Sequence, residues 1–137
     1  LNASFLRALH FENISDLNSI ITMDMLSFLR IERDFGSFDA WQRDFIACCM
    51  ASRDGYGLTG YSIFLQRYVN FVIDTEGLNV PIGVIPVIVL DVAEGSYYRD
   101  YGGDRKTYIA AMMKEFNWSK IEKRFERADS VAKVFAK

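Results

Sequence analysis

The chain has 137 residues, of which half are hydrophobic and 15% are aromatic, so it is long enough and apolar enough to bury a core. Its 16 basic and 18 acidic residues give a net charge of −2, which argues against broad electrostatic attraction to nucleic acid. No apolar run approaches the roughly 20 residues that span a bilayer, so no membrane contact is expected.

The first 30 residues have the apolar spacing of helices. Residues 1–11 fit a short helix that carries His10, the single histidine of the chain, which is most simply a surface or partly buried helix residue. Ser15 is a suitable N-cap for a second helix over residues 15–29, whose core face would include Leu29. The sequence therefore predicts a helical N-terminal part over residues 1–30.

A glycine turn at Gly36 leads into the next predicted helix. Ser37 is placed to cap a helix that runs from residue 38 to about residue 53. Its inner face would hold Trp41, Phe45, Ile46 and Cys49; the adjacent Cys48 and Cys49 are expected to be small core residues rather than a disulfide. Gly55-Tyr56-Gly57 follows without the Lys-Ser/Thr of a phosphate loop, so these residues are predicted to form a turn.

Three segments are predicted strands. Residues 59–65 and 68–73 are rich in β-branched and aromatic residues, and Gln66-Arg67 between them indicates a tight hairpin. After a loop over residues 75–83, residues 84–90 form an apolar run that fits a strand buried on both faces near its C-terminal half. Pro86 is tolerated near the start of such a strand.

Asp91 places an ionisable group directly after this last strand. It is either a functional carboxylate held by a rigid element or a cap for the helix that follows, and the residue alone leaves both open. Gly102-Gly103 then interrupts a helical pattern, which resumes over residues 105–116.

A last helix is expected to start after Asn117 and to bury Ile121 and Phe125. The tail over residues 128–137 carries a short apolar stripe of Val131, Val134 and Phe135. This stripe fits the docking end of a helix better than a membrane anchor.

The segment Asp91–Tyr98, DVAEGSYY, resembles the signature Asp-x-Trp-Glu-His-Ala-Tyr-Tyr of the iron/manganese superoxide dismutase family. Tyr101, Arg105 and Tyr108 follow at the spacing of that family. The resemblance implies an α+β fold, with a C-terminal domain over residues 31–137 in which helices flank a three-stranded antiparallel sheet. Residues 1–30 would be the remnant of the family's N-terminal helical domain.

The resemblance also implies where metal ligands would stand. Asp91 keeps its ligand identity, whereas Gly95 occupies the position of one histidine and Ala3 that of another. One histidine in the chain cannot meet the family's requirement for three, and a single carboxylate does not hold iron or manganese. No nucleophile with a histidine base and no convincing carboxylate pair replaces this site. We therefore expect this chain to have no catalytic residues, metal or cofactor of its own.

Two functional hypotheses of different classes follow from the resemblance. The first is a catalytically inactive structural protein, similar to the superoxide dismutase-like components of the mitochondrial ribosome small subunit, and hence located in the mitochondrial matrix. The second is a metal-dependent superoxide dismutase completed by ligands outside this chain. A generic stress-related scaffold outside the ribosome is a weaker third possibility.

The first hypothesis carries specific partner predictions. Glu94, Tyr97 and Tyr98 are retained at positions where the family forms its two-fold interface, so they are predicted to contact a related superoxide dismutase-like subunit in a heterodimer. Mitochondrial ribosomal proteins would be the other neighbours. Limited rRNA contact would involve the C-terminal tail, because residues 114–137 hold seven Lys/Arg and four Asp/Glu, a local charge of +3.

Overall fold

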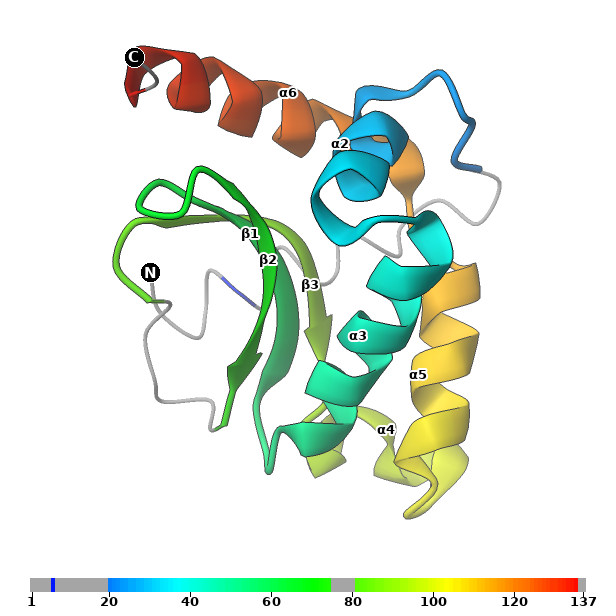
Figure 1. Ribbon diagram of the computed structural model, residues 1–137. Helices are drawn as coiled ribbons and strands as arrows, with labels where there is room; N and C mark the ends of the chain where they lie inside the picture. Colours follow the sequence, from blue (N-terminus) through cyan, green and yellow to red (C-terminus); the bar gives the residue numbers. More distant parts are fainter. Residues whose placement is uncertain (1–5, 7–19, 75–80, 136–137) are drawn as a thin grey trace.

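The computed structural model describes residue 6, residues 20–74 and residues 81–135. A three-stranded antiparallel sheet has α3 and α5 packed on one face, with α2 and α6 at one end of the sheet and α4 at the other (Figure 1). The predicted α+β class is therefore confirmed. The elements, in chain order, are α2 (Leu26–Phe35), α3 (Phe38–Ala51), β1 (Tyr56–Ser62), β2 (Arg67–Ile73), β3 (Val84–Asp91), α4 (Glu94–Tyr101), α5 (Arg105–Lys114) and α6 (Trp118–Phe135).

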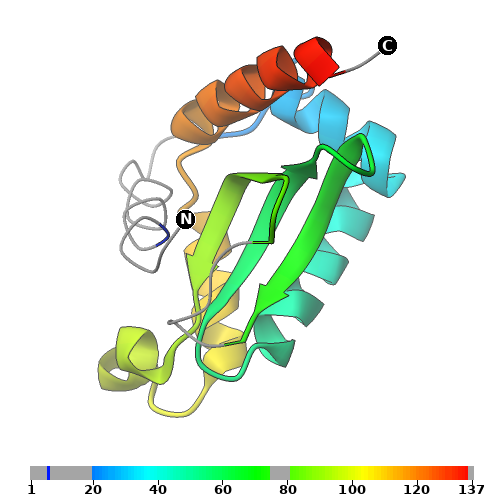
Figure 2. The same ribbon diagram turned by 90° about the vertical axis from the view of Figure 1, so that its left-hand side faces the viewer.

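The strand order is β2-β1-β3, so β1 lies in the centre (Figure 2). The pairing of β1 with β3 shifts by one residue between Thr59 and Gly60. Thr59 pairs with Ile88 and Gly60 pairs with Pro86, so Val87 is the extra residue of a β-bulge. A bulge on an edge strand tolerates a proline that lacks an N–H group. From the bulge residue Val87 to the end of β3, residues 87–91 are all buried, which confirms the predicted burial of the C-terminal half of this strand.

The start of β1 differs from the prediction. Gly55-Tyr56-Gly57 is not a turn as a whole, because β1 already begins at Tyr56, and the hairpin turn lies at residues 63–66 rather than at Gln66-Arg67. The reason is packing against α3. A Cβ on Gly57 would lie 2.2 Å from the Sγ of Cys49, so glycine at this position permits close approach of a helix to the sheet.

The start of α2 also differs from the prediction of a helix over residues 15–29. Residues 15–19 lie outside the described residues, residues 20–22 are not helical, and Leu29 is 49% exposed whereas Ile31 is fully buried. The helix begins at Leu26 because the Glu122 carboxylate of α6 accepts hydrogen bonds from the Leu26 and Ser27 N–H groups, at 2.7 and 2.8 Å. Residue 30 lies within α2. The division of the chain into an N-terminal part over residues 1–30 and a domain over residues 31–137 stays a prediction.

The other helix starts agree with local sequence signals. Ser37 caps α3 by accepting a hydrogen bond from the Ala40 N–H group, and Asn117 does the same for α6 through the Lys120 N–H group. The predicted inner residues Trp41, Phe45, Cys49, Ile121 and Phe125 are fully buried, and Ile46 is partly buried. At the end of α6, however, Val134 and Phe135 are 77% and 52% exposed, so the expected docking of the tail does not extend to them.

The sheet has a buried cluster on each face. Tyr61, Tyr68, Ile88 and Leu90 belong to the main core, with the inner residues of α3, α5 and α6. On the second face, Tyr56, Leu58, Ile73 and Val89 pack with Leu6. Because side chains alternate along a strand, Asp91 shares the second face with Val89. No helix of the described segments is long and apolar enough to cross a membrane.

Replacement of Glu122 tests the cap that α6 provides for α2. We expect Glu122→Ala to lower the free energy of unfolding by about 1–2 kcal/mol, because two N–H groups at a helix N-terminus lose a charged acceptor. Urea unfolding followed by circular dichroism measures the change. The control Glu126→Ala removes an exposed carboxylate one turn further along α6 and should change the stability by less than about 0.5 kcal/mol. Equal effects of the two variants would refute the cap.

Candidate functional site

The candidate site lies at the junction of β3 and α4, where Asp91 ends the strand. Its side chain is almost fully buried, at 2% exposure, and Oδ1 accepts a hydrogen bond of 2.9 Å from the Ala93 N–H group. Ala93 occupies the N-cap position of α4, and Asp54 accepts a hydrogen bond from the Glu94 N–H group. Asp91 therefore fixes the turn between strand and helix, rather than standing in the N-cap position itself.

Tyr108 of α5 holds the main chain at the same junction. Its hydroxyl donates a 2.7 Å hydrogen bond to the carbonyl oxygen of Asp91. The ring of Tyr97 stacks on Tyr108 at a centroid distance of 5.1 Å, and Tyr101 meets Tyr108 edge-on at 5.7 Å. Burial raises the pKa of Tyr108 above its ordinary value, and the neighbouring Asp91 charge raises this pKa further, so the phenol remains a hydrogen-bond donor.

Arg105 connects this cluster to the end of α3. Its Nε donates to the Tyr97 hydroxyl at 3.2 Å, and its guanidinium lies 5.8 Å from the centre of the Tyr97 ring. The other guanidinium nitrogens donate to main-chain carbonyls at the C-terminal end of α3, those of Cys49, Met50, Ser52 and Arg53. A cation thus satisfies carbonyls that the helix leaves without N–H partners. In the sequence, Arg105 stood out only by its distance from the family signature at residues 91–98. No local signal indicated that it would bind the end of α3.

Gly95 leaves the outer side of the junction open. It lies on the exposed first turn of α4, and a Cβ added there would meet no atom of the described residues within 4 Å. Across residues 20–74 and 81–135, no group of three or more His, Cys, Asp or Glu residues is arranged to hold a metal ion. The donors present in the described part therefore do not fit iron or manganese on their own. Ala3, His10 and most of the loop before β3 lie outside the described residues.

The predicted interface residues differ in their surroundings. Glu94 and Tyr98 are exposed, Tyr98 to 60%, whereas Tyr97 is only 5% exposed and packs inward on Tyr108. Tyr97 therefore has a clear role within the chain. Contact with another subunit stays a prediction for all three residues.

Tyr108 gives the site a testable pH dependence. We expect Tyr108→Phe to lower the free energy of unfolding by about 1 kcal/mol at about pH 8, because the hydrogen bond to Asp91 is lost. The raised pKa stabilises the folded state below the ordinary value of 10.0, and this contribution is lost as the pH rises above 10. The difference between wild type and variant should therefore shrink by about pH 10.5.

Urea unfolding at the two pH values measures this difference. The control Tyr98→Phe, at an exposed position of α4, should follow the wild type at both. A difference between wild type and Tyr108→Phe that does not change with pH would contradict the assignment.

Comparison with known proteins supports the signature. Residues 24–124 match the family described as iron/manganese superoxide dismutases, C-terminal domain. The chain is 39% identical over 99 residues to a superoxide dismutase [Fe] of Aquifex pyrophilus, which covers 72% of this chain and 46% of that protein. It is 36% identical over 99 residues to superoxide dismutase [Mn] 2 of Haloferax volcanii, with 72% and 49% covered. The superoxide dismutase [Mn] of Mycobacterium avium is 31% identical over 103 residues, with 74% and 50% covered.

These relatives correct the first functional hypothesis. An inactive structural component of the mitochondrial ribosome is contradicted, because the proteins that the chain matches are named as superoxide dismutases. The expectation that the protein is not an enzyme is wrong for the same reason. The chain spans about half the length of the curated relatives it matches, and Gly95 lies within the matched part. The chain belongs to the iron/manganese superoxide dismutase family, as a member of its C-terminal domain.

Proposed function

We propose that this chain supplies the C-terminal half of a metal-dependent superoxide dismutase whose metal ligands are completed from outside the chain. The observation that carries the proposal is the family match over residues 24–124, which contains Asp91 at the end of β3 in the order of the family signature. The relatives named as iron or manganese superoxide dismutases support the same activity.

The geometry at Asp91 suits a residue that contributes to a metal site. A carboxylate at a rigid strand end, fixed by the Ala93 N–H group and by Tyr108 on its main chain, has little freedom to move. Dismutation of superoxide requires a redox-active metal, and the described residues do not hold one by themselves. In this proposal the remaining donors come from outside the chain, either from a preceding N-terminal segment or from a partner subunit, and Gly95 on the exposed first turn of α4 leaves room beside the junction.

Metal analysis of the native assembly tests the proposal. The tagged chain should be purified from its own source under non-denaturing conditions, together with the chains bound to it. We expect that assembly to contain a stoichiometric amount of iron or manganese, measured by inductively coupled plasma mass spectrometry, and to have superoxide dismutase activity. The isolated chain should contain neither metal, because a single carboxylate is too weak a site.

Asp91→Asn distinguishes a ligand from a structural residue. The amide keeps an acceptor for the Ala93 N–H group but loses the negative charge, so the fold should persist while the metal content of the assembly falls by about tenfold or more. The control Asp39→Asn changes an exposed residue of α3 and should leave the metal content unchanged. An assembly without metal and without activity would overturn the proposed function.

We further propose that a related subunit contacts the exposed side of α4 through Glu94 and Tyr98. Tyr98→Ala and Glu94→Ala should weaken the heterodimer by about tenfold each, because large interface aromatics and paired charges carry much of the binding energy. Native mass spectrometry measures the fraction of complex, with Lys123→Ala on the exposed surface of α6 as the control. A homodimer without any heteromeric species would refute the heterodimer.

The mitochondrial location also stays a prediction.

A further inference from the structure

An exposed apolar surface lies at the end of the sheet next to α2 and α6, opposite the end that carries Asp91. The turn between β1 and β2 places Phe64 and Leu65 there, and the segment that enters β3 adds Ile82. The exposed fractions of these three side chains, here called the hairpin patch, are 76%, 62% and 89%. Figure 2 shows the turn and the start of β3 side by side, with the C-terminal end of α6 above them.

Main-chain hydrogen bonds fix the turn that carries the hairpin patch. The Ile63 N–H group donates to the carbonyl oxygen of Gly83 at 2.8 Å, and the Leu65 N–H group donates to Oγ of Ser62 at 3.1 Å. A Cβ on Gly83 would lie 2.5 Å from the Phe64 ring, so this ring lies directly against the main chain before β3. Large apolar side chains thus stand in solvent on a fixed turn, a place where small polar residues and glycine are usual.

The segments at this end of the sheet carry positive charge. Arg67 begins β2 directly after the turn, and Lys133 is exposed near the end of α6. Residues 63–67, 81–84 and 130–135 contain these two cations and no Asp or Glu, although the whole chain has a net charge of −2. Val134 and Phe135, at 77% and 52% exposure, add apolar area at the end of α6. This surface therefore combines projecting apolar side chains with positive charge.

Shape and charge together favour one kind of partner. A second copy of the chain would bring two positively charged surfaces together, which is unfavourable. A stable protein partner covers roughly 800 Å² on each side, whereas a turn and its neighbouring segment offer a small projecting surface. A lipid bilayer needs no matching shape, takes apolar side chains in among its headgroups, and attracts cations when its lipids are anionic.

We propose that the hairpin patch binds the surface of an anionic lipid bilayer, with its apolar side chains among the headgroups and with Arg67 and Lys133 against lipid phosphates. The contact differs from the sequence-based expectation of no membrane contact, which rested on the length of apolar runs. Side chains from separate segments meet at this surface, so no spanning run is required. The proposal does not depend on the proposed dismutase activity.

Vesicle binding by the full folded chain tests the proposal. The probes are vesicles of equimolar phosphatidylglycerol and phosphatidylcholine and vesicles of phosphatidylcholine alone, and co-sedimentation measures the bound fraction. We expect saturable binding to the anionic vesicles, about tenfold weaker binding to the neutral ones, and a loss of this difference at high salt.

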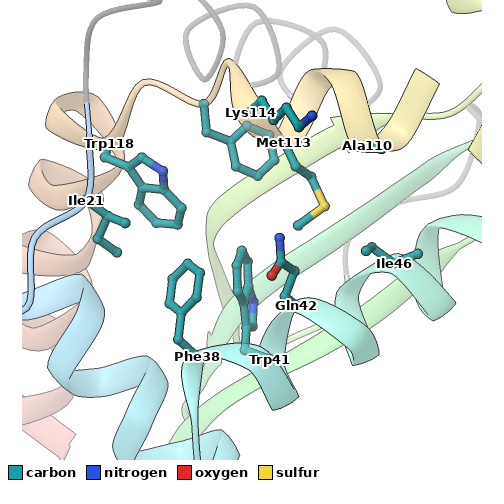
Figure 3. A pocket seen from close by; sticks show the side chains of 10 residues that line it. Ile21, Phe38, Trp41, Gln42, Ile46, Ala110, Met113, Lys114 and Trp118 are labelled. Carbon is teal, nitrogen blue, oxygen red and sulfur yellow. The ribbon is translucent and has the colours of Figure 1, made fainter. Parts of the chain in front are cut away.

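An added tryptophan reports whether the hairpin patch itself meets the lipid. Trp41 and Trp118 line a pocket beside α3 and α5 (Figure 3) and are 0% and 6% exposed, so vesicles should not change their emission. Phe64→Trp places an indole in the patch, and its emission should shift to shorter wavelength when anionic vesicles are added. The matched control Met23→Trp replaces a side chain of the same 76% exposure before α2 and should show no shift.

Further variants separate the apolar contribution from the electrostatic one. Ile82→Ser and Leu65→Ser should each weaken binding to the anionic vesicles about fivefold or more, whereas Met23→Ser should have no effect. Arg67→Gln should weaken binding to the anionic vesicles about three- to fivefold and leave binding to the neutral ones unchanged. Lys106→Gln, at an exposed position of α5, should change neither. Circular dichroism verifies that each variant stays folded.

Equal binding of anionic vesicles by the wild type and by Ile82→Ser would overturn the proposal, and so would the absence of binding to either kind of vesicle. A concentration-dependent dimer in sedimentation equilibrium that Ile82→Ser abolishes, without vesicle binding, would assign the hairpin patch to a second copy and overturn it as well.

Discussion

The hydrogen bonds of Arg105 hold together the part of the molecule on which the candidate site depends. One guanidinium on α5 reaches the carbonyl groups at the end of α3 and the hydroxyl of Tyr97 on α4. Tyr97 in turn stacks on Tyr108, whose hydroxyl holds the main chain at Asp91. Three helices and the end of β3 therefore meet around one cation and two phenols, and the position of the Asp91 carboxylate follows from this packing.

Long-range polar contacts of the same kind fix other elements. Glu122 on α6 caps α2, and Asp34 of α2 accepts a hydrogen bond from the Tyr68 N–H group on the edge strand β2. Asp129 accepts hydrogen bonds from both Arg30 and Tyr68, which links α2, β2 and α6. Charged groups thus satisfy main-chain donors at helix ends and at a sheet edge, where the secondary structure itself offers no partner.

The functional assignment rests on the family match and on the names of the relatives rather than on a complete set of metal ligands in this chain. The described residues contain no group of three or more metal-ligating side chains, and the whole chain has one histidine. The relatives named as superoxide dismutases are about twice the length of the matched region.

Signals within a few residues were sufficient for much of the fold. Ser37 and Asn117 cap their helices through groups three residues away, and the apolar run of β3 marks a buried strand in any context. The family signature at Asp91 further identified the three-stranded antiparallel sheet before any contact was known.

Features that depend on residues far apart in the chain could not be predicted from such local signals. The start of α2 follows from Glu122, which is 96 residues away from Leu26, and the glycine at position 57 reflects the approach of Cys49. The role of Arg105 likewise arises only when separate helices come together. The sequence by itself determined the local caps, the strand pattern and the family. The tertiary structure decided where α2 and β1 begin and what surrounds Asp91, because those outcomes are set by contacts between residues far apart in the chain.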